Sequence, residues 1–212
     1  MDRDFWLARW QGNQIGFHEG VPNTLLTAHF AALALPIGRR IFVPLCGKSN
    51  DMLWLRAQGL RVAGAELSRL AVKQFFAELG LTPFAAQAGR LERFEAEDVT
   101  LFLGDIFDLD QNTLGPVDAV YDRAALVALP APLREHYAAH LIELTHAAPQ
   151  LLITFEYDQT RHQGPPFSVQ DAEVLAHYGA DYRVQHVERR EVPGGLKGLC
   201  PAQESIWLIT PR

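Results

Sequence analysis

Continuous apolar runs alternate with amphipathic segments along most of this chain. Four runs have the length and composition of buried strands: Ile41–Leu45, Arg61–Glu66, Val99–Leu103 and Val117–Tyr121. Helical spacing or helix-ending residues mark the segments around them: Asn23–Leu35 before Pro36, Asn50–Gln58 before Gly59, Ser68–Leu79 with Ser68 as its cap and Gly80 after it, and Pro132 toward Thr145. This alternation predicts a parallel sheet covered by helices on both faces.

The C-terminal part departs from the alternation. Gln150–Phe155 predicts a fifth strand and Ser168–Tyr178 a helix capped by Ser168, whereas Tyr182–Val192 and Ser205–Thr210 predict two strands with no helix between them. The predicted fold is α/β: a doubly wound, mostly parallel seven-stranded sheet that ends in an antiparallel hairpin. Two long connections, Thr82–Asp98 and Glu191–Gln203, have the length of loops that cover sites.

The clearest chemistry lies where the first strand ends. Gly47 follows the apolar run, and Glu66 stands nineteen positions later at the end of the second run. A glycine turn that opens a helix, with an acid about 20 residues on, is typical of a nucleoside site: the glycine admits the ligand and the carboxylate accepts the ribose hydroxyls. An ordinary strand–helix turn with a solvated acid gives the same pattern, so both interpretations stay open at this point.

The turn has no features for holding phosphates. Neither G-x-G-x-x-G nor G-x-x-x-x-G-K-[ST] occurs, and Lys48 after the single Gly47 does not make a phosphate-binding loop. A nucleoside cofactor without a pyrophosphate favours S-adenosylmethionine over NAD, FAD or ATP.

Composition narrows the class of protein. The 212 residues are 48% hydrophobic and 21% charged, with a net charge of -6, which predicts one globular domain and disfavours nucleic acid or an anionic membrane as a partner. No secretory signal or 18-residue apolar span occurs, and Cys46 and Cys200 form no disulfide or zinc spacing, so we expect a cytoplasmic protein. His136 and His140 have the spacing of a metal pair but lack a third ligand, and no metal is expected.

An ordered set of short motifs covers nearly the whole chain. They are Trp6-x3-Trp10, Gly16-Phe17-His18, Pro44-Leu45-Cys46-Gly47-Lys48, Gly64-Ala65-Glu66-Leu67-Ser68, Asp105-Ile106-Phe107-Asp108-Leu109, Asp122-Arg123-Ala124-Ala125-Leu126-Val127-Ala128 and Gly164-Pro165-Pro166-Phe167. In this set the chain resembles the thiopurine S-methyltransferase family, in its short bacterial form. The resemblance implies a class I, Rossmann-like methyltransferase spanning 1–212, with residues 1–22 covering the active site.

The resemblance also implies a role for individual residues. Those expected to bind S-adenosylmethionine are Trp6, Trp10, Leu45, Gly47, Glu66, Asp105, Ile106 and Arg123. Phe17 is expected to face the aromatic acceptor, and Arg123 to act in catalysis between cofactor and acceptor. From the residues alone, Arg123 could equally pair with Asp118 or Asp122, and the two tryptophans could simply pack.

Two positions depart from the family pattern. Ala124 stands where many relatives have Gly, and a second arginine on the substrate side has no clear counterpart, although Arg189 and Arg190 are candidates. The stiff segment Gly164–Phe167 is a candidate wall of the substrate cavity, or simply the lead-in to the next helix.

The expected reaction is methylation of the sulfur of thiopurines and related aromatic or heterocyclic thiols. The family resemblance extends this expectation to selenium and tellurium compounds. An in-line transfer from a sulfonium requires alignment and no covalent nucleophile, and the chain has no convincing triad or G-x-S-x-G. Two alternatives remain: an NAD-linked oxidoreductase and a non-catalytic nucleoside-binding module. We expect a monomer with a small-molecule thiol substrate.

Overall fold

The computed structural model describes residues 3–212 and divides the chain into two compact units, Met1–Val120 and Tyr121–Arg212. Met1 and Asp2, at the start of the predicted N-terminal segment, lie outside the described residues. Within the described residues, no helix is long and apolar enough to cross a membrane.

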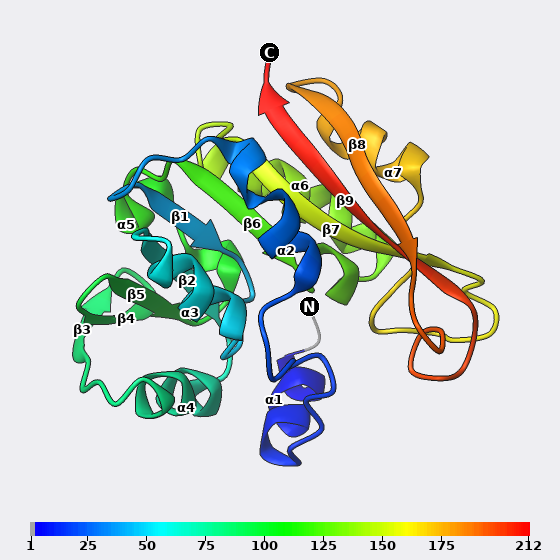
Figure 1. Cartoon of the computed structure of the whole chain (residues 1–212). Coiled ribbons are helices and arrows are strands. Elements are labelled where there is room, and N and C mark those ends of the chain that lie inside the picture. Colours follow the sequence, from blue (N-terminus) through cyan, green and yellow to red (C-terminus); the bar gives the residue numbers. More distant parts are fainter. Residues whose placement is uncertain (1–2) are drawn as a thin grey trace. The chain divides into compact units, whose positions relative to one another are not determined.

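The first unit is built on a mixed sheet (Figure 1). Its strands are β1 (Arg40–Val43), β2 (Arg61–Glu66), β3 (Phe84–Ala88), β4 (Leu91–Ala96), β5 (Val99–Leu103) and the start of β6 (Ala119–Arg123). Their order is β3-β4-β5-β2-β1-β6. β1 pairs in parallel with β2 and β6, and β2 with β5, whereas β4 is antiparallel to both β3 and β5.

The three helices that the sequence predicts in the first unit are present, although Asn23–Leu35 contains an α-helix followed by a 3-10 turn. The helices of this unit are α1 (Arg3–Gln11), α2 (Thr24–His29), α3 (Asn50–Ala57), α4 (Arg69–Glu78) and α5 (Gln111–Leu114), with 3-10 turns η1 (Phe30–Leu33) and η2 (Ile106–Asp108). Ser68 caps α4 by accepting from the N–H of Ala71, as the sequence predicts. α4 places Phe75 and Phe76 in the core, and burying each ring is worth about 2–3 kcal/mol.

The second unit contains the C-terminal strands and two α-helices. Its elements are the end of β6, η3 (Leu126–Ala128), α6 (Ala131–Leu144), β7 (Gln150–Tyr157), α7 (Asp171–Tyr178), β8 (Tyr182–Glu191) and β9 (Ala202–Pro211). β9 pairs antiparallel with both β7 and β8, and β8 and β9 form a long ribbon in Figure 1. The antiparallel C-terminal pair is therefore confirmed.

Two local predictions were wrong. The connection Thr82–Asp98 contains the hairpin β3–β4, so the described residues form nine strands and not seven. Charged residues interrupt the apolar alternation of β4, and pairing with β5 holds the strand in place. Ser168 does not cap α7, whose N-cap is Gln170, because its hydroxyl accepts a hydrogen bond from the N–H of Tyr157.

Candidate nucleoside site and comparison with known proteins

The turn after β1 has a constrained backbone. Leu45 and Gly47 have φ of 44° and 56°, in the left-handed region, and the N–H of Cys46 donates to Ala65 O at 2.9 Å. A left-handed conformation is unfavourable for leucine and tolerated by glycine, so the turn is held by its surroundings and not by local preference. Strain of this kind clusters at ligand sites.

The carboxylate of Glu66 closes this turn from β2. It is 5% exposed, and its two oxygens accept from the N–H of Gly47 at 2.8 Å and from the N–H of Ser68 at 2.6 Å. Burial raises the pKa of Glu66 to about 7, although the hydrogen bonds from Ser68 and Gly47 act in the opposite direction. Each carboxylate oxygen has a second lone pair, so the group can accept further hydrogen bonds from a pair of vicinal hydroxyls.

Aromatic rings from the N-terminal segment cover the turn. A Cβ on Gly47 would lie 3.1 Å from the ring of Trp10, which is 5% exposed. Phe17 meets both tryptophans edge-on, with ring centroids 5.5 Å from Trp10 and 5.8 Å from Trp6. Glycine suits position 47, because a side chain there would be strained by the left-handed backbone and would require a small shift of the Trp10 ring.

The remaining first-unit candidates follow β5. Gly104 N–H donates to the backbone oxygen of Glu66, Asp105 accepts from the N–H of Phe107 at 3.2 Å, and Ile106 is buried. Since β5, β2 and β1 are parallel neighbours, their carboxyl ends meet at one edge. The candidates Leu45, Gly47, Glu66, Asp105 and Ile106 therefore lie at one end of the sheet, where open α/β sheets bind ligands.

Arg123 belongs to the second unit. It ends β6 and is half-buried, and the next residue, Ala124, has a φ of 61°. Asp118 accepts from the Arg39 side chain and the Arg40 N–H, so this acid already has partners. The role of Arg123 stays a prediction.

The candidates for a second substrate-side arginine are bound within their own unit. Arg189 donates to Ser205 and pairs with Asp171, and Arg190 holds the carboxylate of Glu204 at 2.7 Å. These contacts fix both guanidinium groups to the β8–β9 ribbon and its surroundings.

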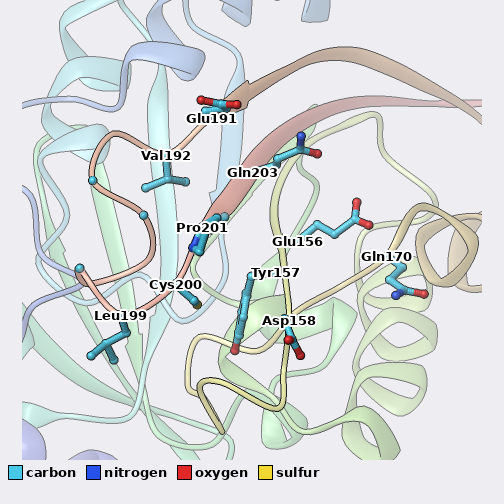
Figure 2. A pocket seen from close by; sticks show the side chains of 14 residues that line it. Glu156, Tyr157, Asp158, Gln170, Glu191, Val192, Leu199, Cys200, Pro201 and Gln203 are labelled. Carbon is cyan, nitrogen blue, oxygen red and sulfur yellow. The ribbon is translucent and has the colours of Figure 1, made fainter.

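The second unit also contains a cavity of about 760 Å³, lined in part by the connection Glu191–Gln203, whose length in the sequence is typical of loops that cover sites (Figure 2). Figure 2 shows Glu156, Tyr157 and Asp158 from the end of β7, facing a loop that carries Leu199 and Cys200. Acidic and amide side chains supply its polar lining, and none of the residues predicted to bind lies there. Glu156 and Asp158 belong to no recognisable sequence motif, so only the packing of the loop on β7 identifies them as residues of this cavity.

No group of three or more His, Cys, Asp or Glu side chains that could hold a metal occurs within residues 3–212. Cys46 is buried, and both desolvation and the nearby Glu66 raise the pKa of its thiol well above the ordinary range. The thiol at the turn is therefore neutral and inert at physiological pH.

Comparison with known families shows which family this chain belongs to. The family model described as Thiopurine S-methyltransferase (TPMT) matches residues 1–209. The chain belongs to the thiopurine S-methyltransferase family. The resemblance that the sequence motifs predicted is thereby confirmed.

Bacterial members of the thiopurine S-methyltransferase family are similar over the full length. One from Xanthobacter autotrophicus is 57% identical over 210 residues, covering 99% of both chains. Another, from Gluconobacter oxydans, is 52% identical over 207 residues, covering 98% of this chain and 94% of its own.

Solved structures share the fold at low identity. The 1,6-didemethyltoxoflavin-N1-methyltransferase of Burkholderia thailandensis, with bound S-adenosylhomocysteine, has a TM-score of 0.66 at 15% identity and covers 98% of this chain and 87% of its own. The magnesium protoporphyrin IX methyltransferase of Synechocystis, also with S-adenosylhomocysteine, has a TM-score of 0.66 at 13% identity and covers 98% and 99%. The predicted class I methyltransferase fold is confirmed.

Proposed function

We propose that this chain methylates the sulfur of thiopurines and related aromatic or heterocyclic thiols, with S-adenosylmethionine as the methyl donor. The observation that carries the proposal is the buried carboxylate of Glu66, bonded to the N–H of Gly47 at the end of the parallel strands, in a chain of this family. The family match extends over residues 1–209, which supports treating 1–212 as one methyltransferase domain.

The residues at the turn fit a nucleoside sulfonium. Glu66 has lone pairs left for the two ribose hydroxyls, and the close contact of Trp10 with Gly47 sets an aromatic wall beside them. An aromatic face attracts a cation through the ring quadrupole, which suits Trp6 and Trp10 to the sulfonium end. Asp105 and Ile106 follow β5 at the same sheet edge, which supports their proposed role beside the adenine.

The first turn of α3 argues against a dinucleotide. Ser49 caps this helix through the N–H of Asp51, and the carboxylate of Asp51, 1% exposed, accepts from the N–H of Asn23 at 2.7 Å. A buried acid at the helix N-terminus would repel a pyrophosphate, which normally binds at such a terminus. An NAD-linked oxidoreductase is therefore disfavoured.

In this reaction the protein binds the cofactor and the acceptor and aligns them. S-adenosylmethionine supplies an already activated methyl group when bound, and a heteroaromatic thiol is a good nucleophile near neutral pH. Arg123 holds an electron-rich acceptor ring through its fixed charge and planar donors, and Phe17 stacks on that ring. A strong general base is not required, because the heteroaromatic thiol is itself a good nucleophile, and Trp6, Trp10 and Phe17 exclude water from the reacting atoms.

We further infer a cytoplasmic monomer whose segment 1–22 covers the active site. The contact of Trp10 with Gly47 supports the covering role, because it places α1 over the turn within the first unit. The proposed acceptor range extends to selenium and tellurium compounds, whose nucleophilic atoms are softer than sulfur.

Mass spectrometry of 6-mercaptopurine tests the proposal. Incubation with the protein and S-adenosylmethionine should add one methyl group to the thiol. Arg123→Ala should lower transfer much more than the affinity for S-adenosylhomocysteine, and Arg123→Lys should retain part of the activity as a charge-matched control. Cofactor binding without methyl gain on any of a panel of thiols would instead identify a non-catalytic module.

A further inference from the structure

A buried acid sits directly before Arg123 in the second unit. Asp122 has no exposed surface, and its carboxylate accepts from the hydroxyl of Tyr137 at 2.7 Å and from the N–H of Leu126 at 3.1 Å. The N–H of Ala125 is a further donor to the same carboxylate. Tyr137 comes from the middle of α6, so this carboxylate ties the end of β6 to a helix and to the start of η3.

The turn enclosed by these bonds is strained. Ala124 has a φ of 61°, in the left-handed region that is unfavourable for an L-residue. The amide groups of the next two residues point to the Asp122 carboxylate, and these bonds hold the backbone in this conformation. Arg123 lies between the anchored acid and the left-handed residue, so the direction of its side chain depends on the turn.

We propose that Asp122 and Tyr137 are positioning residues for Arg123, which fix the turn that directs the guanidinium toward the methyl acceptor. This inference rests on the proposed role of Arg123 in thiol methylation. Tyr137 acts at one remove: its hydroxyl anchors the carboxylate, the carboxylate anchors the turn, and the turn places Arg123.

The ionisation of Asp122 provides a pH-dependent readout that distinguishes a positioning role for this residue from a general contribution to stability. Burial raises the pKa of Asp122 to about 6, and the hydrogen bond from Tyr137 opposes that rise. The groups on packed elements that face it are Tyr137 on α6 and Tyr178 on α7, with Tyr182 on β8 next to Tyr178, and burial raises the pKa of all three. All three are therefore neutral near pH 7, and removing the Tyr137 hydroxyl must raise the pKa of Asp122 further.

A protonated Asp122 binds the two turn amides less strongly, because hydrogen bonds to an ionised acceptor are about twice as strong as those to a neutral one. We therefore expect Tyr137→Phe to move the acidic limb of kcat/KM for 6-mercaptopurine to higher pH. At pH 7 the loss should be about tenfold, and the Kd for S-adenosylhomocysteine should change little.

Tyr178→Phe is the matched control. It makes the same change in the same buried cluster, but the Tyr178 hydroxyl has no hydrogen-bond partner within residues 3–212. It should keep the pH profile of the unmodified protein. Asp122→Asn, which cannot ionise, provides a second test if Tyr137→Phe folds poorly, and it should flatten the acidic limb relative to the unmodified protein.

The four proteins are assayed with one acceptor, so titration of the thiol itself cancels in the comparison. Unchanged profiles in both Tyr137→Phe and Asp122→Asn would overturn the positioning role, as would equal losses of kcat/KM and cofactor affinity. An unmodified protein that transfers no methyl group would instead reject the proposed function, and this inference with it.

Discussion

Glu66 should make folding depend on pH in an unusual direction. Its pKa rises from 4.5 to about 7 because the carboxyl is buried. That rise corresponds to about 3 kcal/mol of free energy required to ionise the group in the folded protein. A carboxyl with a raised pKa contributes stability that is complete below about pH 4.5 and is lost as the pH rises through about 7.

The comparison with Glu66→Gln isolates this effect. The amide of glutamine can accept from only one of the two N–H groups, of Gly47 and Ser68, so the variant should lose about 1–3 kcal/mol at pH 5. Between about pH 5 and 8, the free energy of unfolding of the unmodified protein should fall by about 2.5 kcal/mol relative to the variant, as linkage requires. Urea unfolding measures both values, and parallel changes in the two proteins would refute the reasoning.

Cofactor binding should show the opposite trend. An ionised Glu66 accepts hydrogen bonds from two hydroxyls, whereas the protonated acid has one acceptor position fewer. Affinity for S-adenosylhomocysteine should therefore weaken by up to about tenfold per pH unit below about pH 7. Calorimetry on Glu66→Gln is the control because the ligand titrates identically, and it should give weak, pH-independent binding. An unchanged affinity in the variant would refute the ribose role.

Two further predictions concern the backbone. Ala124→Gly should raise the free energy of unfolding, measured in urea, by up to about 1 kcal/mol. Glycine relieves the left-handed strain at a φ of 61°, although it loses more entropy on folding. A lower stability of the variant would contradict the claim that Ala124 is strained. Gly64→Ala should cost about 1–3 kcal/mol, since its Cβ would lie 2.6 Å from Cys46 Sγ and 2.8 Å from Leu101 Cδ2. Cys46→Ala should recover part of that loss, and a strictly additive double mutant would argue against the clash.

The sequence predicted those helices and strands whose limits are set by residues within or next to the element itself. β2 has the predicted limits Arg61–Glu66, and Ser68 caps α4 as expected, because apolar run length and capping chemistry act over a few residues. The contact between Gly47 and Glu66 could also be predicted from the sequence, because consecutive parallel strands bring the first turn beside the end of the second strand.

Other features depend on contacts between distant residues. The charged hairpin β3–β4 is held by the pairing of β4 with β5. Ser168 accepts a hydrogen bond from the N–H of Tyr157 and does not cap the following helix. The cavity beside Tyr157 forms only when the loop carrying Cys200 packs on β7. No spacing in the sequence predicts these contacts, because side chains from separate elements create them.

The sequence by itself determined the alternating fold, the phosphate-free turn and the acid that closes it, since each follows from short-range patterns of polarity and backbone preference. The tertiary structure alone decided that Glu66 is buried with a pKa near 7, that Trp10 covers Gly47, and that Tyr137 anchors Asp122. Desolvation and ring packing depend on the three-dimensional surroundings of a group, which the order of residues specifies only through the completed fold.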